Sequence, residues 1–180
     1  ERISDHLPKT QKYLPKQRLW YIRANEVLIS SGSIERPLVF GNNDTPGVML
    51  STAAKEYMKV YGVLVGKKPL IFTNNDSGYE TAIEFKKNGV NPLILDTRKE
   101  PSSDIINEAK NLGIQIKFSY VVVAAKGYKK VKSADIAKIS ENKEELGTVE
   151  SIKCDCICVS GFWTPTIHLA SQSGNKTKFN

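Results

Sequence analysis

The sequence predicts an α/β fold, namely a Rossmann-like, three-layer βαβαβ unit followed by an antiparallel β-meander. Two observations support this fold class. Between residues 69 and 113, short apolar runs alternate with segments whose apolar residues recur every three or four positions, which favours parallel strands joined by crossover helices. After Gly113, apolar runs are separated only by turn residues, which is typical of antiparallel strands.

The residues before this unit are predicted to be a polar leader, two short strands and a connector. Residues 19–23 and 26–30 are apolar enough for strands, and the connector that follows is rich in Gly, Pro, Asn and Asp up to Gly47. Ser51 is placed to cap a helix. The buried stripe of that helix is expected to be Ala54, Tyr57, Met58 and Tyr61.

The βαβαβ unit starts with a strand at 70–72. Ser77 and Glu80 have the spacing of a capping box for the next helix, which should bury Ala82, Ile83 and Phe85 and end at Gly89. A second strand, 92–95, ends at Asp96. A second helix begins near Ser103 and stops at Gly113, with an inner face of Ile105, Ile106, Ala109 and Leu112.

The meander is expected to use strands at 114–123, 130–139 and 148–152. The turn before its second strand contains Gly127 and Tyr128 among solvated lysines at 126, 129, 130 and 132. A last apolar strand, 156–159, leads to Ser160 and Gly161, and Pro165 is expected to start a helix.

Composition narrows the classes of function. The formal charge of +7 is mostly scattered and has no nucleic-acid-binding motif beside it, so we expect no nucleic acid partner, while an acidic partner surface stays open. No stretch approaches the roughly 18 apolar residues of a membrane span, and the first residues lack a secretory apolar region, so we expect a soluble, cytoplasmic protein.

The three cysteines, Cys154, Cys156 and Cys158, alternate along one predicted strand. Residues two apart on a strand stand roughly 7 Å apart, too far to surround one tetrahedral metal. We therefore interpret them as buried thiols in a reducing compartment and expect no metal site.

The chemically informative segment is the turn from Thr73 to Gly78, where the first strand meets its helix. A dinucleotide-binding turn has glycines in the spacing Gly-x-Gly-x-x-Gly, and only the third, Gly78, is present here. That glycine permits close packing of helix on strand, so the pattern favours the fold more than the phosphate site. Asp96 lies about twenty residues further on, where an acidic residue meets the ribose hydroxyls.

Two features of this turn oppose nucleotide binding. The side chains of Thr73 and Asn75 occupy space that the missing glycines would leave open. Asp76 places a negative charge at the helix N-terminus, where a phosphate would bind. Two interpretations remain: Asp76 and Ser77 cap the helix, or the asparagines Asn74 and Asn75 hydrogen-bond a different ligand.

No nucleophile with a general base emerges from the rest of the sequence. His6 lies in the polar leader, and we expect His168 to be packed or exposed rather than catalytic. Trp20 and Trp163 are interpreted as packing residues rather than as partners for a cofactor ring.

Several runs resemble the alpha subunit of heterotetrameric sarcosine oxidase, and together they cover essentially the whole chain. They are RLWYIRA (18–24), SGSIERPLVF (31–40), NDTPGVML (43–50), FTNNDSGY (72–79) and VSGFWTP (159–165), followed by His168, Leu169 and SQSG (171–174). The resemblance implies that the glycine-poor turn is a trait of the family.

The resemblance also implies an architecture similar to flavoproteins with two dinucleotide-type domains, one inserted into the other. Residues 1–47 would then hold the leader, the returning segment of a first, FAD/NAD-type domain, and a connector. Residues 48–153 would form the second, NAD(P)-binding-like domain, and 154–180 would return to the first. On this interpretation the chain is a fragment of a larger subunit.

By resemblance, the complete enzyme oxidises the N-methyl group of sarcosine, giving glycine, hydrogen peroxide and, with tetrahydrofolate, methylenetetrahydrofolate. NAD is expected in the alpha subunit, FAD in the beta subunit and FMN between them, so the other subunits are the expected partners. Because hydride removal belongs to the beta subunit, no catalytic residue is expected here and the fragment alone should be inactive. The residues expected to contact a cofactor are Ser31, Gly32, Glu35, Arg36, Ser160 and Gly161, together with Asn74, Asn75, Asp76, Ser77, Gly78 and Asp96 near the turn.

Two alternatives remain open. The chain could be a self-sufficient NAD-binding domain of another flavin-linked dehydrogenase, which would need the glycines missing at positions 73 and 75. It could also be a subunit-docking module that binds no nucleotide, and a large exposed apolar patch would favour that function.

Overall fold

The structure, a computed structural model, describes residues 1–9, 12–140, 146–174, 176 and 178. It divides into two compact units, one formed by Glu1–Ser31 with Ile167–Asn180 and the other by Gly32–Thr166. In the first unit, Arg2 pairs with Gln17, and the C-terminal segment contains a short helix, α4 (His168–Gln172). None of the helices within the described residues is long and apolar enough to cross a membrane.

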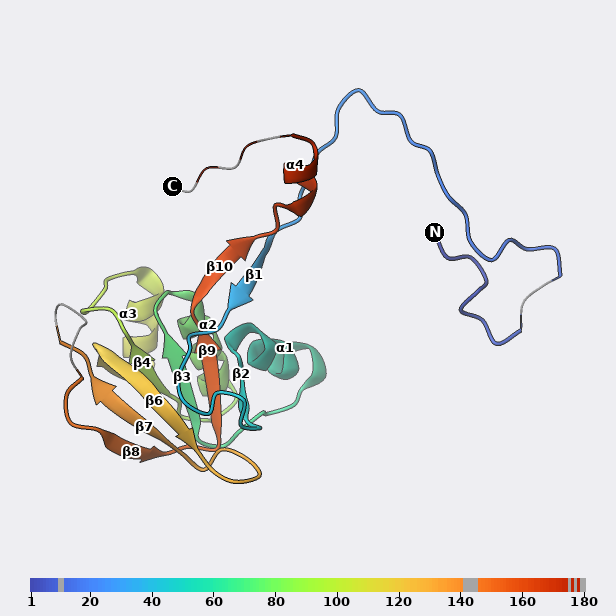
Figure 1. The fold of residues 1–180 in the computed structure, drawn as a ribbon. Helices are drawn as coiled ribbons and strands as arrows, with labels where there is room; N and C mark the ends of the chain where they lie inside the picture. Colours follow the sequence, from blue (N-terminus) through green and yellow to red (C-terminus); the bar gives the residue numbers. More distant parts are fainter. Residues whose placement is uncertain (10–11, 141–145, 175, 177, 179–180) are drawn as a thin grey trace. The chain divides into compact units, whose positions relative to one another are not determined.

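The larger unit is organised around a five-stranded sheet (Figure 1). All neighbouring strands in it are parallel. Their order is β2 (Val48–Leu50), β9 (Cys156–Ser160), β3 (Pro69–Thr73), β4 (Leu93–Asp96) and β5 (Gln115–Phe118). The latest of these strands in the sequence, β9, is thus inserted between two early ones.

Side-chain alternation along β3 shows how the sheet is covered on both faces. Ile71 belongs to a core shared with three helices, α1 (Ser51–Tyr61), α2 (Ser77–Lys87) and α3 (Asp104–Asn111). Leu70 and Phe72 belong to a second core shared with the antiparallel meander β6 (Tyr120–Lys126), β7 (Ser133–Lys138) and β8 (Glu150–Lys153). Because successive side chains on a strand point to opposite faces, one apolar strand supplies both cores.

The predicted fold class is therefore confirmed. The order β3, α2, β4, α3, β5 is the predicted βαβαβ unit, the meander follows it, and helices, sheet and meander form the three layers (Figure 1). Gly89 and Gly113 follow α2 and α3 with positive φ angles of 77° and 70°, as expected of residues that end helices.

A two-stranded antiparallel ribbon lies where the chain enters and leaves the larger unit. It pairs β1 (Ser33–Arg36) with β10 (Phe162–Pro165). The helix predicted to start at Pro165 is wrong at that position, because pairing opposite Ser33 keeps Pro165 extended and the helix α4 begins at His168.

The strands predicted at 19–23 and 26–30 are also wrong. Neither segment pairs with another strand among the described residues, and Tyr21 and Leu28 are more than nine-tenths exposed. An apolar run becomes a strand only where a neighbouring strand satisfies its backbone groups, and the sequence pattern does not contain that information. The two strands β1 and β2 were missed for the same reason, since β1 is a short segment inside the predicted connector and β2 is a short segment between that connector and the predicted helix.

Four other local predictions need correction. The strand expected at 114–123 is interrupted at Ser119, whose positive φ of 58° separates β5 in the parallel sheet from β6 in the meander. On α1, Ala54 and Met58 are buried as predicted, but Tyr57 and Tyr61 are exposed, and on α3 Leu112 is exposed as well. Ser51 is not the cap of α1 but its first residue, and it is fully buried.

The cysteines are free and buried, as the sequence predicted. Cys156 and Cys158 contribute to the helix-side core and Cys154 to the meander-side core. Burial raises the pKa of Cys154 to about 12, and a hydrogen bond with Cys156 together with burial raises the pKa of Cys158. Both thiols are consequently neutral in the folded protein at physiological pH.

We predict that the free energy of unfolding decreases as the pH rises above about 9. The folded state keeps its protons, whereas a thiol of the unfolded chain ionises near pH 8.5 and stabilises that state by up to about 1.4 kcal/mol per pH unit. Urea unfolding at pH 7, 9 and 10 measures the slope. The double variant Cys154→Ala/Cys158→Ala is the control, and an equally steep decrease in this variant would contradict the explanation.

Candidate functional site

The candidate site is the turn that joins the carboxyl end of β3 to α2. Thr73 is fully buried; its hydroxyl donates to the carbonyl of Asn75 (2.8 Å) and accepts from the Asn75 amide (3.1 Å). A Cβ placed on Gly78 would lie 2.7 Å from the Cβ of Thr73. Position 78 must therefore be glycine for α2 to pack this closely on β3, as the sequence indicated.

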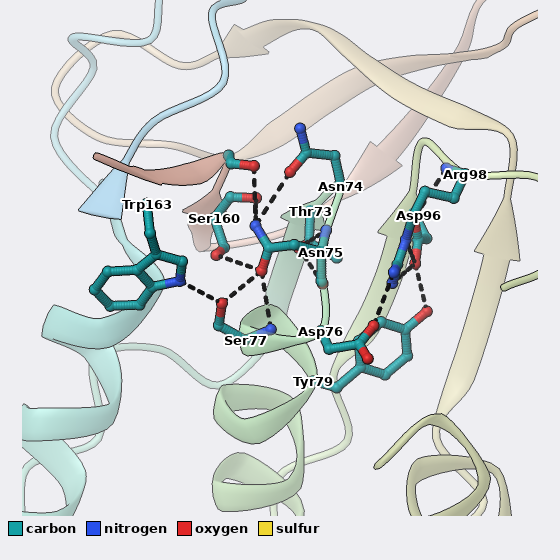
Figure 2. Close-up of polar contacts among 11 residues, drawn as sticks. Thr73, Asn74, Asn75, Asp76, Ser77, Tyr79, Asp96, Arg98, Ser160 and Trp163 are labelled. Carbon is teal, nitrogen blue, oxygen red and sulfur yellow. Dashed lines mark hydrogen bonds and ion pairs between the residues drawn. The ribbon is translucent and has the colours of Figure 1, made fainter. Parts of the chain in front are cut away.

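The side chain of Asn75 fills the turn (Figure 2). Its Nδ2 donates to the carbonyl of Gly161 (2.9 Å) and to Oδ1 of Asn74 (3.1 Å). Its Oδ1 accepts from the amide of Ser77 (2.9 Å) and from the hydroxyls of Ser77 (2.5 Å) and Ser160 (3.3 Å). One amide thus ties the turn after β3 to the end of β9.

The backbone donors of the turn are mostly used within the protein. The amide of Asn74 bonds the carbonyl of Ser160, the amides of Asn75 and Ser77 bond side chains of the turn, and that of Tyr79 bonds the carbonyl of Asp76. A bound pyrophosphate needs such donors to be free and needs room beside them. With Asn75 in that space and Asp76 adding a negative charge, these residues do not fit a dinucleotide pyrophosphate.

The second half of the site is an ionic network at the carboxyl end of β4. Asp96 is fully buried, and Arg98 forms bonds to both of its oxygens, with Nη2 2.8 Å from Oδ2 and Nε 3.0 Å from Oδ1. Nη1 of the same guanidinium lies 2.8 Å from Oδ1 of Asp76. The hydroxyl of Tyr79 donates to Asp96 at 2.7 Å. Arg98 thereby joins the start of α2 to the end of β4 (Figure 2).

The pKa directions in this network follow from burial and pairing. Burial and then the bond to Asp96 raise the pKa of Tyr79. Burial opposes the charge of Arg98, but its bonds to Asp96 and Asp76 outweigh that effect and raise its pKa. The guanidinium is therefore a permanent cation held between two carboxylates, and Asp96 has its oxygens engaged where a ribose would need them.

The expected capping of α2 is wrong in its details. Asp76 is the N-cap residue, but it makes no side-chain capping hydrogen bond because its carboxylate pairs with Arg98. The capping box between Ser77 and Glu80 does not form either. Ser77 donates to Asn75, and Glu80 pairs with Lys55 on α1 at 2.5 Å.

The structure brings together some of the other predicted contact residues. Gly161 donates its amide to the carbonyl of Arg36 (2.8 Å), and a Cβ at this position would lie only 2.6 Å from that carbonyl, so the strands approach too closely for any side chain here. Ser160 and Gly161 meet the turn through Asn75, as described. Gly32 lies at the end of the ribbon, where its carbonyl accepts from Thr166, while Ser31 belongs to the other unit.

Glu35, another predicted cofactor contact, lies beside the N-terminus of α1. Its side chain is buried, and Oε2 accepts from the amide (3.0 Å) and the hydroxyl (2.5 Å) of Thr52. A carboxylate at this position stabilises the N-terminus of α1. Glu35 therefore attaches β1 to the helix layer.

Sequence reasoning missed three residues of the site. Arg98 and Tyr79 were not singled out, although an arginine two residues after a strand-end aspartate and a tyrosine in the first helical turn were the available signals. Trp163 was interpreted as a packing residue, yet its indole donates to the Ser77 hydroxyl at 2.8 Å and links β10 to the turn. Among the described residues there is no group of three or more His, Cys, Asp or Glu side chains that could hold a metal ion.

Comparison with known proteins identifies the relatives of this chain. No protein-family model matches it. It is 37% identical over 177 residues to the sarcosine oxidase subunit alpha of Rhizobium meliloti (strain 1021), and 34% identical over 163 residues to that of Corynebacterium sp. (strain P-1). These alignments cover 98% and 89% of the chain. The chain is a relative of one segment of sarcosine oxidase alpha subunits.

The resemblance inferred from the sequence is thus confirmed, and the chain spans about 17% of the length of these alpha subunits. Solved structures agree on the fold. Thioredoxin reductase from T. acidophilum matches with a TM-score of 0.65 and 18% identity over 82% of this chain and 47% of its own. L-proline dehydrogenase from P. horikoshii matches with a TM-score of 0.50 and 24% identity over 84% of this chain and 24% of its own.

We predict that Arg98→Met lowers the free energy of unfolding by about 3 kcal/mol, because it leaves the fully buried Asp96 without its cation. Adding Asp96→Asn should restore part of that loss, since the amide carries no charge that needs a partner. Denaturant unfolding of the two variants gives both values. Arg36→Met removes an exposed arginine and should change stability by less than about 0.5 kcal/mol. A loss in Arg98→Met no larger than in Arg36→Met would show that the network contributes little.

Proposed function

We propose that this chain forms the second nucleotide-type domain of a sarcosine oxidase alpha subunit and serves there as a scaffold without catalytic groups. The observation that carries the proposal is the self-filled turn, in which Asn75 occupies the phosphate position of a dinucleotide fold and bonds Ser160 and Gly161 instead. The similarity of nearly the whole chain to alpha subunits supports the proposed assembly.

In this proposal the flanking segments complete a first, FAD/NAD-type domain, and the larger unit, Gly32–Thr166, forms the second. The predicted boundary at residue 154 is too early, because β9 lies between β2 and β3 in the sheet of that unit. The whole assembly oxidises the CH–NH bond of sarcosine to give glycine and hydrogen peroxide, with methylenetetrahydrofolate formed from tetrahydrofolate. FAD and FMN are assigned to the rest of the complex. The three free thiols suit a reducing compartment such as the cytoplasm.

We assign NAD to the first domain rather than to the turn after β3. Residues that could contribute contacts from the larger unit are Gly32, Arg36, Ser160 and Gly161, because the backbones of the last three lie together beside the filled turn. Ser31 stays a predicted contact from the other unit. Glu35 would act indirectly, since its carboxylate already holds the N-terminus of α1.

A role in docking other subunits is compatible with this function, and a separate feature of the surface supports it. The last turns of α1 and the loop after it expose a run of apolar side chains, namely Tyr57, Val60, Tyr61, Val63 and Leu64, each at least 45% exposed. Contiguous exposed apolar residues are typical of surfaces that other parts of an assembly cover. The alternative of a self-sufficient NAD-binding domain is disfavoured by the filled turn.

We predict that the 180-residue chain shows no saturable NAD binding in calorimetric titrations reaching millimolar concentrations. The variant Thr73→Gly/Asn75→Gly restores the Gly-x-Gly-x-x-Gly spacing, frees the turn's backbone amides and should gain weak, saturable binding. Asn91→Gly adds a glycine to an exposed position away from the turn and should gain nothing. Saturable binding by the unmodified chain, abolished by Asp96→Ala, would contradict the proposal and favour a self-sufficient NAD-binding domain.

A further inference from the structure

The loop between β6 and β7 carries a concentration of positive charge that the proposed function does not use. Tyr128, Lys129, Lys130 and Lys132 line a hollow of about 410 Å³. The loop that carries them lies at one end of the meander, between β6 and β7 (Figure 1). Tyr128 is 92% exposed, and all three lysines are exposed. None of these lysines forms an ion pair with a residue that the structure describes, whereas the neighbouring Lys126 pairs with Asp135 at 3.1 Å.

This loop is held in one shape by its backbone. A Cβ on Gly127 would lie 1.9 Å from the carbonyl of Lys130, so the chain folds back tightly on itself there. The amide of Lys132 donates to the carbonyl of Lys126 at 2.8 Å. A loop fixed in this way loses little conformational entropy when a partner binds it.

Val131, in the middle of the lysines, anchors the loop to the protein. Its side chain is 1% exposed and belongs to the meander-side core, and its amide donates to the carbonyl of Pro46 at 2.9 Å. Burying this one apolar residue turns the flanking lysines outward together. The fold therefore fixes the position of the lysines in the loop 127–132, unlike those of a mobile basic tail.

We propose that the loop 127–132 is a docking surface for an acidic protein surface. The chain has a formal charge of +7, so an acidic partner is attracted from a distance as well as at the contact. A central exposed tyrosine surrounded by charges has the anatomy of a protein interface, in which an aromatic anchor lies inside a polar rim. Sites for single-stranded nucleic acid instead combine a long basic groove with several aromatic platforms, and this short loop has one ring.

The test uses the 180-residue chain and a fluorescently labelled poly-L-glutamate peptide as the probe, titrated by fluorescence anisotropy at low salt. We expect the peptide to bind and Lys129→Gln/Lys130→Gln/Lys132→Gln to weaken its binding about fivefold to tenfold, because each exposed ion pair that is lost makes a modest contribution to affinity. Binding should also weaken as salt is added, because exposed charges are screened. The matched control, Lys9→Gln/Lys16→Gln/Lys87→Gln, removes the same charge from exposed, scattered positions and should weaken binding less than twofold.

Three outcomes would overturn this proposal. The control variant could lose as much affinity as the loop variant, which would mean that net charge alone attracts the probe. The chain could fail to bind the peptide at low salt. A labelled single-stranded oligonucleotide of the same charge could bind more tightly than the peptide through the same lysines, which would assign the loop to nucleic acid. None of these results depends on whether the turn after β3 binds NAD, so this proposal and the proposed function can fail separately.

Discussion

The organisation of this protein depends on one side chain, the amide of Asn75. The turn after a parallel strand exposes backbone amides that must find partners, and in a nucleotide-binding turn the ligand supplies them. Here Asn75 supplies an acceptor for Ser77 and a donor for Gly161. The amide of Asn75 thus provides the turn's partners from within the protein and links the end of β3 to the end of β9.

The ionic network of Asp96 likewise provides a buried polar group with partners from within the protein, here through charged side chains. A fully buried carboxylate requires a cation and hydrogen bonds, and Arg98 and Tyr79 provide both from within the domain. Arg98 also holds Asp76, so the negative charge at the start of α2 and the buried charge at the end of β4 share one cation. Both polar positions, at the end of β3 and at the end of β4, thus have their partners within the domain, which supports the proposed scaffold function.

The buried sheet and the exposed loop of lysines differ in what they contribute to the domain. Apolar cores cover both faces of the sheet, and this packing makes the sheet the rigid part of the domain. Surfaces that remain available for contacts lie at its margins, on the exposed end of α1 and on the loop 127–132. In the proposed scaffold function, such surfaces fix the positions of neighbouring parts of the assembly.

The sequence alone determined the βαβαβ unit, the meander, the buried cysteines and the absence of the first two fingerprint glycines, because each of these depends on local residue periodicity or on residue identity at a fixed spacing. It also indicated the family through runs spread along the chain. It did not determine that residues 19–30 pair with no strand among the residues that the structure describes, or that β1 pairs with β10, because strand pairing joins segments far apart in the sequence. Tertiary structure alone decided what the altered turn does. From the sequence alone, Asn75 could face a ligand and Asp96 could face a ribose. In the fold, the residues that follow β9 lie within hydrogen-bonding distance of Asn75, and Arg98 lies within hydrogen-bonding distance of Asp96.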